Sequence, residues 1–171
     1  MKEQGAIASH TISVIVDNEA GVLARVIGLF SGRGYNIESL TVSAVDKRHL
    51  RSRITVVTSG TLMVIEQIKA QLDCLVPVHT VSDMTTAGPH VARDLALVKV
   101  AGEGEKRVEA MRLADVFRAS VVDSTQTSFV FELTGSAVKI DAFIDLMKGL
   151  GLVEVARTGV VAVSRGKEGL V

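Results

Sequence analysis

The sequence predicts an α+β protein built from two ferredoxin-like domains in tandem, each with the element order βαββαβ. Three observations lead to this prediction. Strand-like and helix-like segments follow one another in the same order twice along the 171 residues. A short segment that holds one of only two prolines and lacks any periodicity separates the two series. Apolar residues make up 47% of the chain, which allows each domain to bury a core.

The first series lies in residues 1–84. An alternating apolar pattern is typical of a strand with one buried face, and apolar residues three and four positions apart are typical of an amphipathic helix. The expected elements, in chain order, are a strand over 11–16, a helix over 22–30, strands over 35–45 and 52–60 joined by a polar turn, a helix over 65–75 and a strand over 75–84.

A linker is expected over residues 85–94, because this segment contains Pro89 and shows no periodicity. The second series follows in residues 95–171. Its expected elements are a strand over 95–102, a helix over 105–119, two strands within 120–135, a helix over 137–150 that Ser136 caps, and a closing β segment over 152–166.

Each predicted sheet has one face without helices. In the first domain the residues of this face alternate along two neighbouring strands: Thr11, Ser13, Ile15, Arg53, Thr55 and Val57. This mixture of small polar and apolar side chains is too apolar to be left in water. We therefore expect a second copy of the chain to cover part of the face or to extend the sheet edge to edge, which predicts a homodimer through the first domain.

Charge and cysteine content limit the function and the compartment. The formal net charge is zero, so the chain lacks the basic excess that a non-specific nucleic-acid binder needs. The single cysteine, Cys74, rules out an intrachain disulfide framework, and we expect it to be a structural thiol. No segment resembles a signal peptide or a membrane span. We expect a soluble, cytoplasmic protein that binds neither nucleic acid nor membrane.

No pattern in the sequence predicts a catalytic or a metal site. The four histidines are far apart and show no ligand spacing, and no nucleophile elbow, phosphate loop or dinucleotide fingerprint is present. Phe129 and Phe131 alternate on a predicted strand, as base-stacking aromatics do in RNA-recognition modules. Because Glu132 lies on the opposite face, we expect both phenylalanines in the core instead.

The best candidate for a binding site is the corner DNEAG, residues 17–21, between the first strand and the first helix. If the helix starts at about residue 21, the N–H groups of Gly21, Val22 and Leu23 lack intrahelical partners and suit a carboxylate. Gly21 has no Cβ to block a close approach, and Asn18 offers both a donor and an acceptor. The alternative is a plain turn, in which Asn18 only caps the helix and Gly21 only eases the bend.

The polar turn between the two strands of the first hairpin is strongly basic. It holds Lys47, Arg48, His49 and Arg51. A solvated turn explains this composition, and a docking contact for an acidic partner surface explains it as well.

The stretch DNEAGVLARVIGLFSGRGYNIESLTV strongly resembles the ACT domain in the regulatory (small) subunit of acetohydroxyacid synthase, also called acetolactate synthase. VIEQIKAQLDCLVPV and VEVARTGVVAVSRG resemble further signatures of that family, so the resemblance covers residues 10–166. It implies a non-catalytic protein that binds the catalytic large subunit, raises its activity and confers feedback inhibition by a branched-chain amino acid, usually valine. Thiamine diphosphate, Mg and FAD are then expected on the catalytic subunit, and no cofactor is expected on this chain.

The resemblance also implies an effector site between the ACT domains of two chains. The positions that match are Asn18, Gly21, Val22 and Leu23 from one chain, with Asn36 and Ile37 from its neighbour. Ala20 stands where ACT domains often have proline, and the basic turn stands where the family has a more acidic segment. Two other functions stay open: an activating scaffold without effector sensitivity, and a nucleic-acid-binding pair of ferredoxin-like domains.

Overall fold

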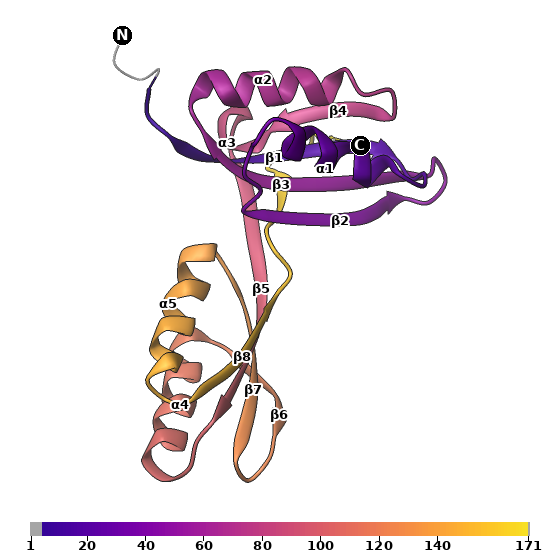
Figure 1. Ribbon diagram of the computed structural model, residues 1–171. Helices are drawn as coiled ribbons and strands as arrows, with labels where there is room; N and C mark the ends of the chain where they lie inside the picture. The colour runs from indigo at the N-terminus through magenta and orange to yellow at the C-terminus, as the bar shows by residue number, and fades with distance from the viewer. Residues whose placement is uncertain (1–4, 171) are drawn as a thin grey trace. The chain divides into compact units, whose positions relative to one another are not determined.

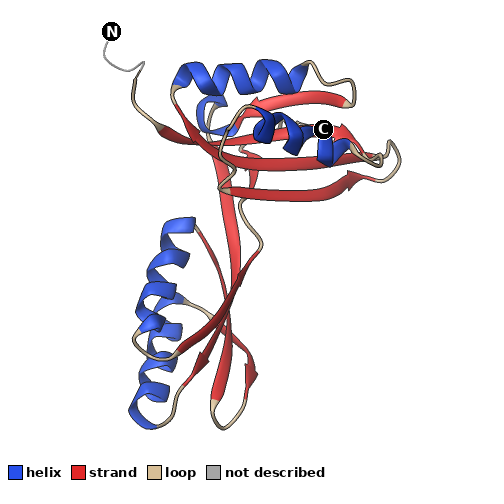
Figure 2. Ribbon diagram, in the orientation of Figure 1, coloured by secondary structure: helices blue, strands red, loops and turns tan. Residues whose placement is uncertain are grey.

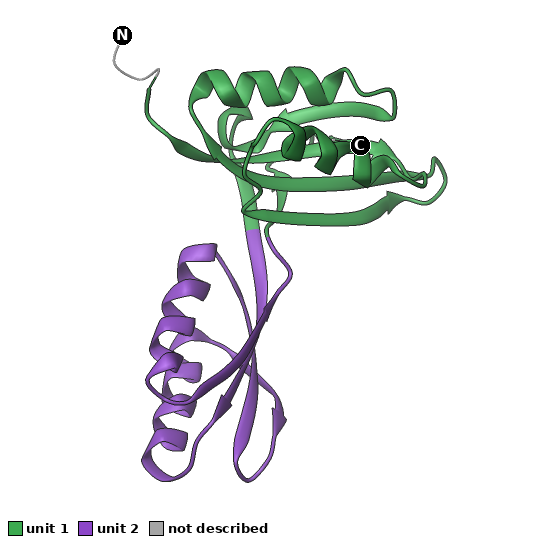
Figure 3. Cartoon of the chain, in the orientation of Figure 1, with its two compact units in different colours: residues 1–92, 160–171 green, residues 93–159 purple. Residues whose placement is uncertain are grey.

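The computed structural model describes residues 5–170, which form two compact units (Figures 1 and 3). Unit 1 comprises the chain up to Ala92 and again from Val160, and unit 2 comprises Arg93–Gly159. Each contains four strands in antiparallel order with two long helices, which confirms the predicted α+β class and the doubled ferredoxin-like plan. Residues 1–4 and 171, predicted as the outer ends of the two domains, lie outside the described part.

Unit 1 repeats the predicted βαββαβ order. Its strands lie in the order β2-β3-β1-β4, and each neighbouring pair is antiparallel. Figure 2 shows α1 and α2 along one face of this sheet. The elements are β1 (Ala8–Asp17), α1 (Val22–Gly32), β2 (Ser39–Asp46), β3 (Arg51–Gly60), α2 (Leu62–Asp73), β4 (Val78–Asp83) and the short α3 (Met84–Ala87).

The core of unit 1 lies between the sheet and the helices α1 and α2. Successive side chains of a strand point to opposite faces, so the alternation in β1 places Ile12, Val14 and Val16 on the helix side. The helices bury residues spaced three or four apart, as the sequence predicts: Val22, Val26, Phe30, Ile65, Ile68 and Leu72.

The chain itself covers part of the other face of the unit 1 sheet, where cover by a second copy was one of two expected arrangements. The other arrangement, a second copy that extends the sheet edge to edge, stays a prediction. Ser13, Ile15 and Thr55 on this face are at most 2% exposed in a single chain. Residues 160–164, which include β9 (Val161–Ser164), lie against this face and are called the C-terminal strap here.

Side chains of the sheet hold the backbone of the C-terminal strap. The hydroxyl of Ser39 accepts a hydrogen bond from the N–H of Val160 at 2.8 Å, and Thr41 Oγ1 donates to the carbonyl of Val160 at 3.1 Å. Arg53 donates to the carbonyl of Ala162 at 3.3 Å. Ser39, Thr41 and Arg53 therefore serve as partners for the backbone of the strap.

The predicted linker over residues 85–94 is replaced by regular structure. Asp83 caps α3, because its carboxylate accepts hydrogen bonds from the N–H of Thr85 at 3.0 Å and from the hydroxyl of Thr86 at 2.9 Å. The strand β5 (His90–Ala101) then begins in unit 1 and continues in unit 2. A four-residue helix is too short to show a period, so the sequence did not indicate it.

Unit 2 has the same strand arrangement, β6-β7-β5-β8, and β9 pairs with β5 outside this order. Its core holds Phe131 fully buried and Phe129 nearly so, which confirms the core placement over base stacking. The guanidinium of Arg107 lies 3.8 Å above the ring of Phe129. The remaining elements are α4 (Gly104–Phe117), β6 (Ser120–Ser124), β7 (Ser128–Gly135), α5 (Ala137–Lys148) and β8 (Leu152–Arg157).

Candidate functional site

The predicted corner joins β1 to α1 and leaves the helix N-terminus open. Gly21 is the N-cap residue, and no side chain caps this helix in the described part of the chain. Asn18 is exposed and does not cap the helix, so the capping role that the plain-turn alternative gives it is wrong. The other part of that alternative, a glycine that eases the bend, agrees with the left-handed backbone of Gly21. The first helical hydrogen bond runs from the N–H of Arg25 to the carbonyl of Gly21 at 3.1 Å. The amides of Leu23 and Ala24 come before it, and the residues four positions back lie outside the helix, so these amides have no intrahelical acceptor.

Glycine at position 21 is explained by its backbone rather than by crowding. Gly21 has a φ of 87°, in the left-handed region that side chains disfavour. A Cβ built at this position meets no heavy atom within 4 Å. No heavy atom therefore lies against Gly21 on the side where a Cβ would stand.

Of the side chains at the corner, some are buried in the core and others are exposed on the surface. Val22 is buried against the sheet, and its N–H donates a hydrogen bond to the carbonyl of Glu19 at 3.4 Å. The expectation that the N–H of Val22 is open to a ligand is therefore wrong for the single chain. Leu23 is exposed beside it. The carboxylate of Asp17 lies 2.5 Å from Nε2 of His79.

Asn36 and Ile37 lie at the other end of the unit from the corner. The carbonyl of Asn36 accepts a hydrogen bond from the hydroxyl of Thr58 at 2.6 Å, whereas Asp17, next to the corner, pairs with Arg51. From Arg51 to Thr58 the strand β3 advances roughly 23 Å at about 3.3 Å per residue. One chain therefore does not bring the six predicted residues together, and a single site would need two chains.

The basic turn contacts the corner directly, which the sequence did not reveal. The N–H of Asn18 donates to the carbonyl of Leu50 at 2.6 Å. Leu50 has a φ of 51°, a left-handed conformation that is rare for a bulky residue. The antiparallel register of β1 and β3 brings the two together, but a left-handed leucine has no sequence signature that would predict the contact.

The basic turn is shaped by Asp46. Its carboxylate accepts hydrogen bonds from the N–H groups of Arg48 at 2.8 Å and His49 at 3.1 Å, and it lies 2.5 Å from Nδ1 of His49. The hydrogen bond with the His49 side chain holds the pKa of Asp46 below its ordinary value.

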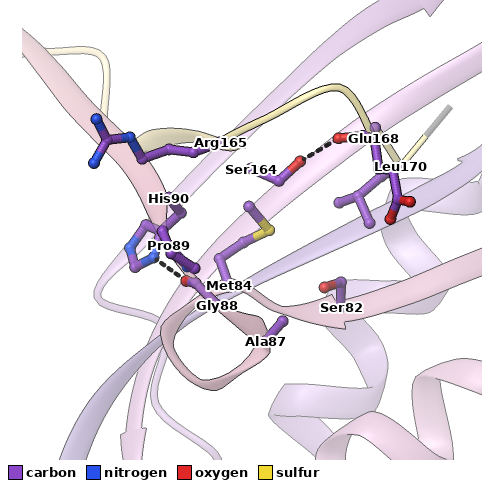
Figure 4. A pocket seen from close by; sticks show the side chains of 11 residues that line it. Ser82, Met84, Ala87, Gly88, Pro89, His90, Ser164, Arg165, Glu168 and Leu170 are labelled. Atoms are coloured by element: carbon purple, nitrogen blue, oxygen red, sulfur yellow. Dashed lines mark hydrogen bonds between the residues drawn. The ribbon is translucent and has the colours of Figure 1, made fainter.

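A hollow of about 250 Å³ lies elsewhere in unit 1, between α3, the start of β5 and the C-terminal residues (Figure 4). Met84 and Ala87 line one side, and the hydroxyl of Ser164 donates to the carbonyl of Glu168 at 3.0 Å on the other. None of the six predicted residues lines it, so it is separate from the corner.

Residues 5–170 show neither a metal-binding cluster nor a helix that could cross a membrane. In this part of the chain no three His, Cys, Asp or Glu side chains gather where they could hold a metal ion. None of the helices described there is both long and apolar enough to cross a membrane. Cys74 is exposed as the C-cap residue of α2.

The two ferredoxin-like units, together with a family match over the first of them, place the chain in the class of two-domain proteins that carry an ACT domain. Residues 12–80 match the family model described as AHAS small subunit-like ACT domain, and residues 93–166 match the model described as small subunit of acetolactate synthase. The chain therefore belongs to the acetolactate synthase small-subunit family, as the sequence motifs predict.

Individual relatives are similar to this chain over almost its full length. The probable acetolactate synthase small subunit of Archaeoglobus fulgidus is 48% identical over 159 residues, which is 93% of this chain and 98% of that one. The acetolactate synthase isozyme 3 small subunit of Escherichia coli is 47% identical over 156 residues, which is 91% of this chain and 94% of that one. The crystal structure of the Thermotoga maritima small subunit is similar with a TM-score of 0.85 at 34% identity, covering 94% and 99%. These names agree with the expectation of a subunit of an enzyme complex rather than a catalytic chain.

Proposed function

We propose that this chain is the regulatory subunit of acetolactate synthase. It binds the catalytic large subunit, raises its activity and makes it sensitive to feedback by a branched-chain amino acid, with valine as the first candidate. Thiamine diphosphate, Mg and FAD belong to the catalytic partner in this proposal. The observation that carries the feedback function is the N-terminus of α1, which no side chain caps and which begins at the uncrowded Gly21.

The chemistry of the corner suits an α-amino acid. Amides at a helix N-terminus and the positive end of the helix dipole attract a carboxylate. The side-chain amide oxygens of Asn18 and Asn36 accept hydrogen bonds from an ammonium group. The exposed side chain of Leu23 and the half-buried Ile37 offer apolar contact for a branched side chain.

A dimer through the edge strand β2 would complete the site. β2 lies at the edge of the unit 1 sheet, and its Val42 and Val45 are exposed. Two copies of β2 that pair antiparallel place the start of one strand beside the end of the other. Asn36 precedes the start of β2, and the corner lies beyond its end, so this pairing brings the Asn36 of one chain to the corner of the other.

Two measurements test the proposed function. The purified chain is added to its cognate catalytic subunit, and acetolactate formation is measured with and without valine, leucine and isoleucine. We expect stimulation without effector and loss of activity with valine. Stimulation that none of the three amino acids reverses would identify an activating scaffold without effector sensitivity. No stimulation at any ratio of the two chains would refute the proposed function.

A further inference from the structure

We propose that the basic turn, residues 46–51, is a docking surface for an acidic and partly apolar patch on the catalytic subunit, and that the effector corner controls its conformation. This inference rests on the proposed function, because it names the surface through which the regulatory subunit acts. Three features of the turn support it: its charge, the conformation of Leu50, and its bond to Asn18.

The turn presents positive charge outward. Lys47 and Arg48 are exposed, and Arg51 is partly so. The one acidic side chain, Asp46, is engaged by the backbone of the turn and by His49. In a chain with zero net charge this is a local basic excess, so the complementary surface is acidic.

Leu50 gives the proposed docking surface an exposed apolar side chain, and its backbone is in a strained conformation. Its side chain is 64% exposed and belongs to neither core cluster, although its φ of 51° is unfavourable for leucine. Strained residues persist where the surroundings hold them in place, and they gather at functional sites. An exposed apolar side chain among cations has the composition of an interface anchor with a polar rim.

The corner holds Leu50 in this conformation. The N–H of Asn18 donates to the carbonyl of Leu50 at 2.6 Å, and the ladder of β1 and β3 ends at the adjacent pair of Asp17 and Arg51. A ligand that binds the side chain of Asn18 acts on the same residue whose backbone fixes Leu50. An effector that shifts Asn18 therefore changes the docking surface, and docking changes the affinity for the effector by the same factor.

Charge reversal tests the docking surface. The variant Lys47→Glu with Arg48→Glu is compared with the control Lys106→Glu with Lys167→Glu, which makes the same charge change at other exposed positions. The measured quantity is the concentration of this chain that half-saturates stimulation of the catalytic subunit, at low and at moderate salt. We expect at least a tenfold increase for the turn variant with a weaker salt dependence than the parent, and less than a twofold change for the control. Equal values for parent and turn variant would overturn the docking surface.

Leu50→Asn separates docking from folding. Asparagine tolerates the left-handed conformation and keeps the backbone carbonyl that Asn18 binds. We expect the midpoint of thermal unfolding to stay equal or rise, while the half-saturating concentration rises about fivefold. If Leu50 had only a structural role, the substitution would change the midpoint of thermal unfolding and leave the half-saturating concentration unchanged. That result would overturn the role of Leu50 as a docking anchor.

Amide hydrogen exchange tests the coupling. We expect valine to change the exchange rates of residues 47–51 in the parent chain. Unchanged exchange rates at a saturating valine concentration would overturn the proposal that the effector corner controls the conformation of the basic turn. Failure of the parent to stimulate the catalytic subunit would refute the proposed function and this inference together, whereas a parent that stimulates and turn variants that match it would refute this inference alone.

Discussion

The carboxylate of Asp94 accepts hydrogen bonds from two guanidinium nitrogens of Arg157, at 2.8 and 2.5 Å, and is only 2% exposed. The hydroxyl of Thr158 donates to the second oxygen of Asp94 at 3.2 Å. These residues lie where the chain enters and leaves unit 2, so one ionic network around a buried carboxylate joins the start of β5 in this unit to the end of β8. The network fixes both connections of unit 2 at one point.

We predict that Asp94→Asn destabilises the chain by about 1–3 kcal/mol, because it removes the charge that pairs with Arg157 and leaves buried donors poorly satisfied. The control is Asp141→Asn, since Asp141 binds the same guanidinium at 2.6 Å but is 58% exposed. This change should cost less than about 1 kcal/mol. Urea denaturation followed by circular dichroism measures both values, and equal losses for the two variants would contradict the prediction.

Most of the fold could be predicted because periodicity reports burial directly. The alternation through Ile12 and Val14 and the helical spacing of Val26 and Phe30 each place one face toward the core. The C-terminal strap could not be predicted in this way. Val160 is bound by Thr41, which is 119 positions away, and a short alternating segment carries no sign of which sheet it will join.

The candidate site could be predicted in part. Asn18 and Gly21 stand out because a bare corner before an amphipathic helix has a clear physical consequence. The separation of Asn36 from this corner depends on the register of the strands, which pattern alone does not give. The bond from Asn18 to Leu50 depends on a backbone conformation that leucine disfavours, so local preference points away from it.

We predict that Gly21→Asp weakens valine feedback much more than Gly21→Asn does. Both side chains have similar size and tolerate a positive φ, so the backbone strain is matched. Aspartate alone sets a negative charge beside the amides that would bind the effector carboxylate. Loss of such a partner costs about 1–3 kcal/mol, or roughly 5- to 150-fold in affinity. Calorimetric titration with valine gives the two affinities, and stimulation of the catalytic subunit should be largely kept in both variants. Equal valine affinities would show that the helix N-terminus does not bind the carboxylate.

We predict that the carboxyl group of Asp46 titrates below its ordinary pKa of 3.8, and that His49→Asn moves its pKa back toward that value. Because the pKa is lowered in the folded chain, the stabilisation of the basic turn is complete above about pH 4 and is lost as the pH falls through the folded pKa. Carboxyl chemical shifts followed by NMR between neutral and acid pH measure this directly. Lys99→Met is the matched control: it should raise the pKa of Glu154, which the hydrogen bond from Lys99 lowers, and leave Asp46 unchanged. If the pKa of Asp46 were the same in the parent and in His49→Asn, the hydrogen bond with His49 would not be the cause of the lowered pKa.

The Asn36 of the proposed effector site comes from the neighbouring chain. In one chain Asn36 and the corner lie at opposite ends of β3, so the proposed site takes its corner from one chain and Asn36 from the other. We predict that Gly21→Asp and Asn36→Phe each lose valine sensitivity when prepared alone. Coexpression of the two variants should restore part of it. A mixed dimer pairs the intact corner of the Asn36→Phe chain with the intact Asn36 of the Gly21→Asp chain, and its other site carries both defects. With random assembly about a quarter of all sites are intact. Valine binding by calorimetry should therefore return with a stoichiometry of about one quarter of the parent value and with parental affinity. If the corner and Asn36 acted within a single chain, every site would keep one defect, and coexpression would restore no binding at all.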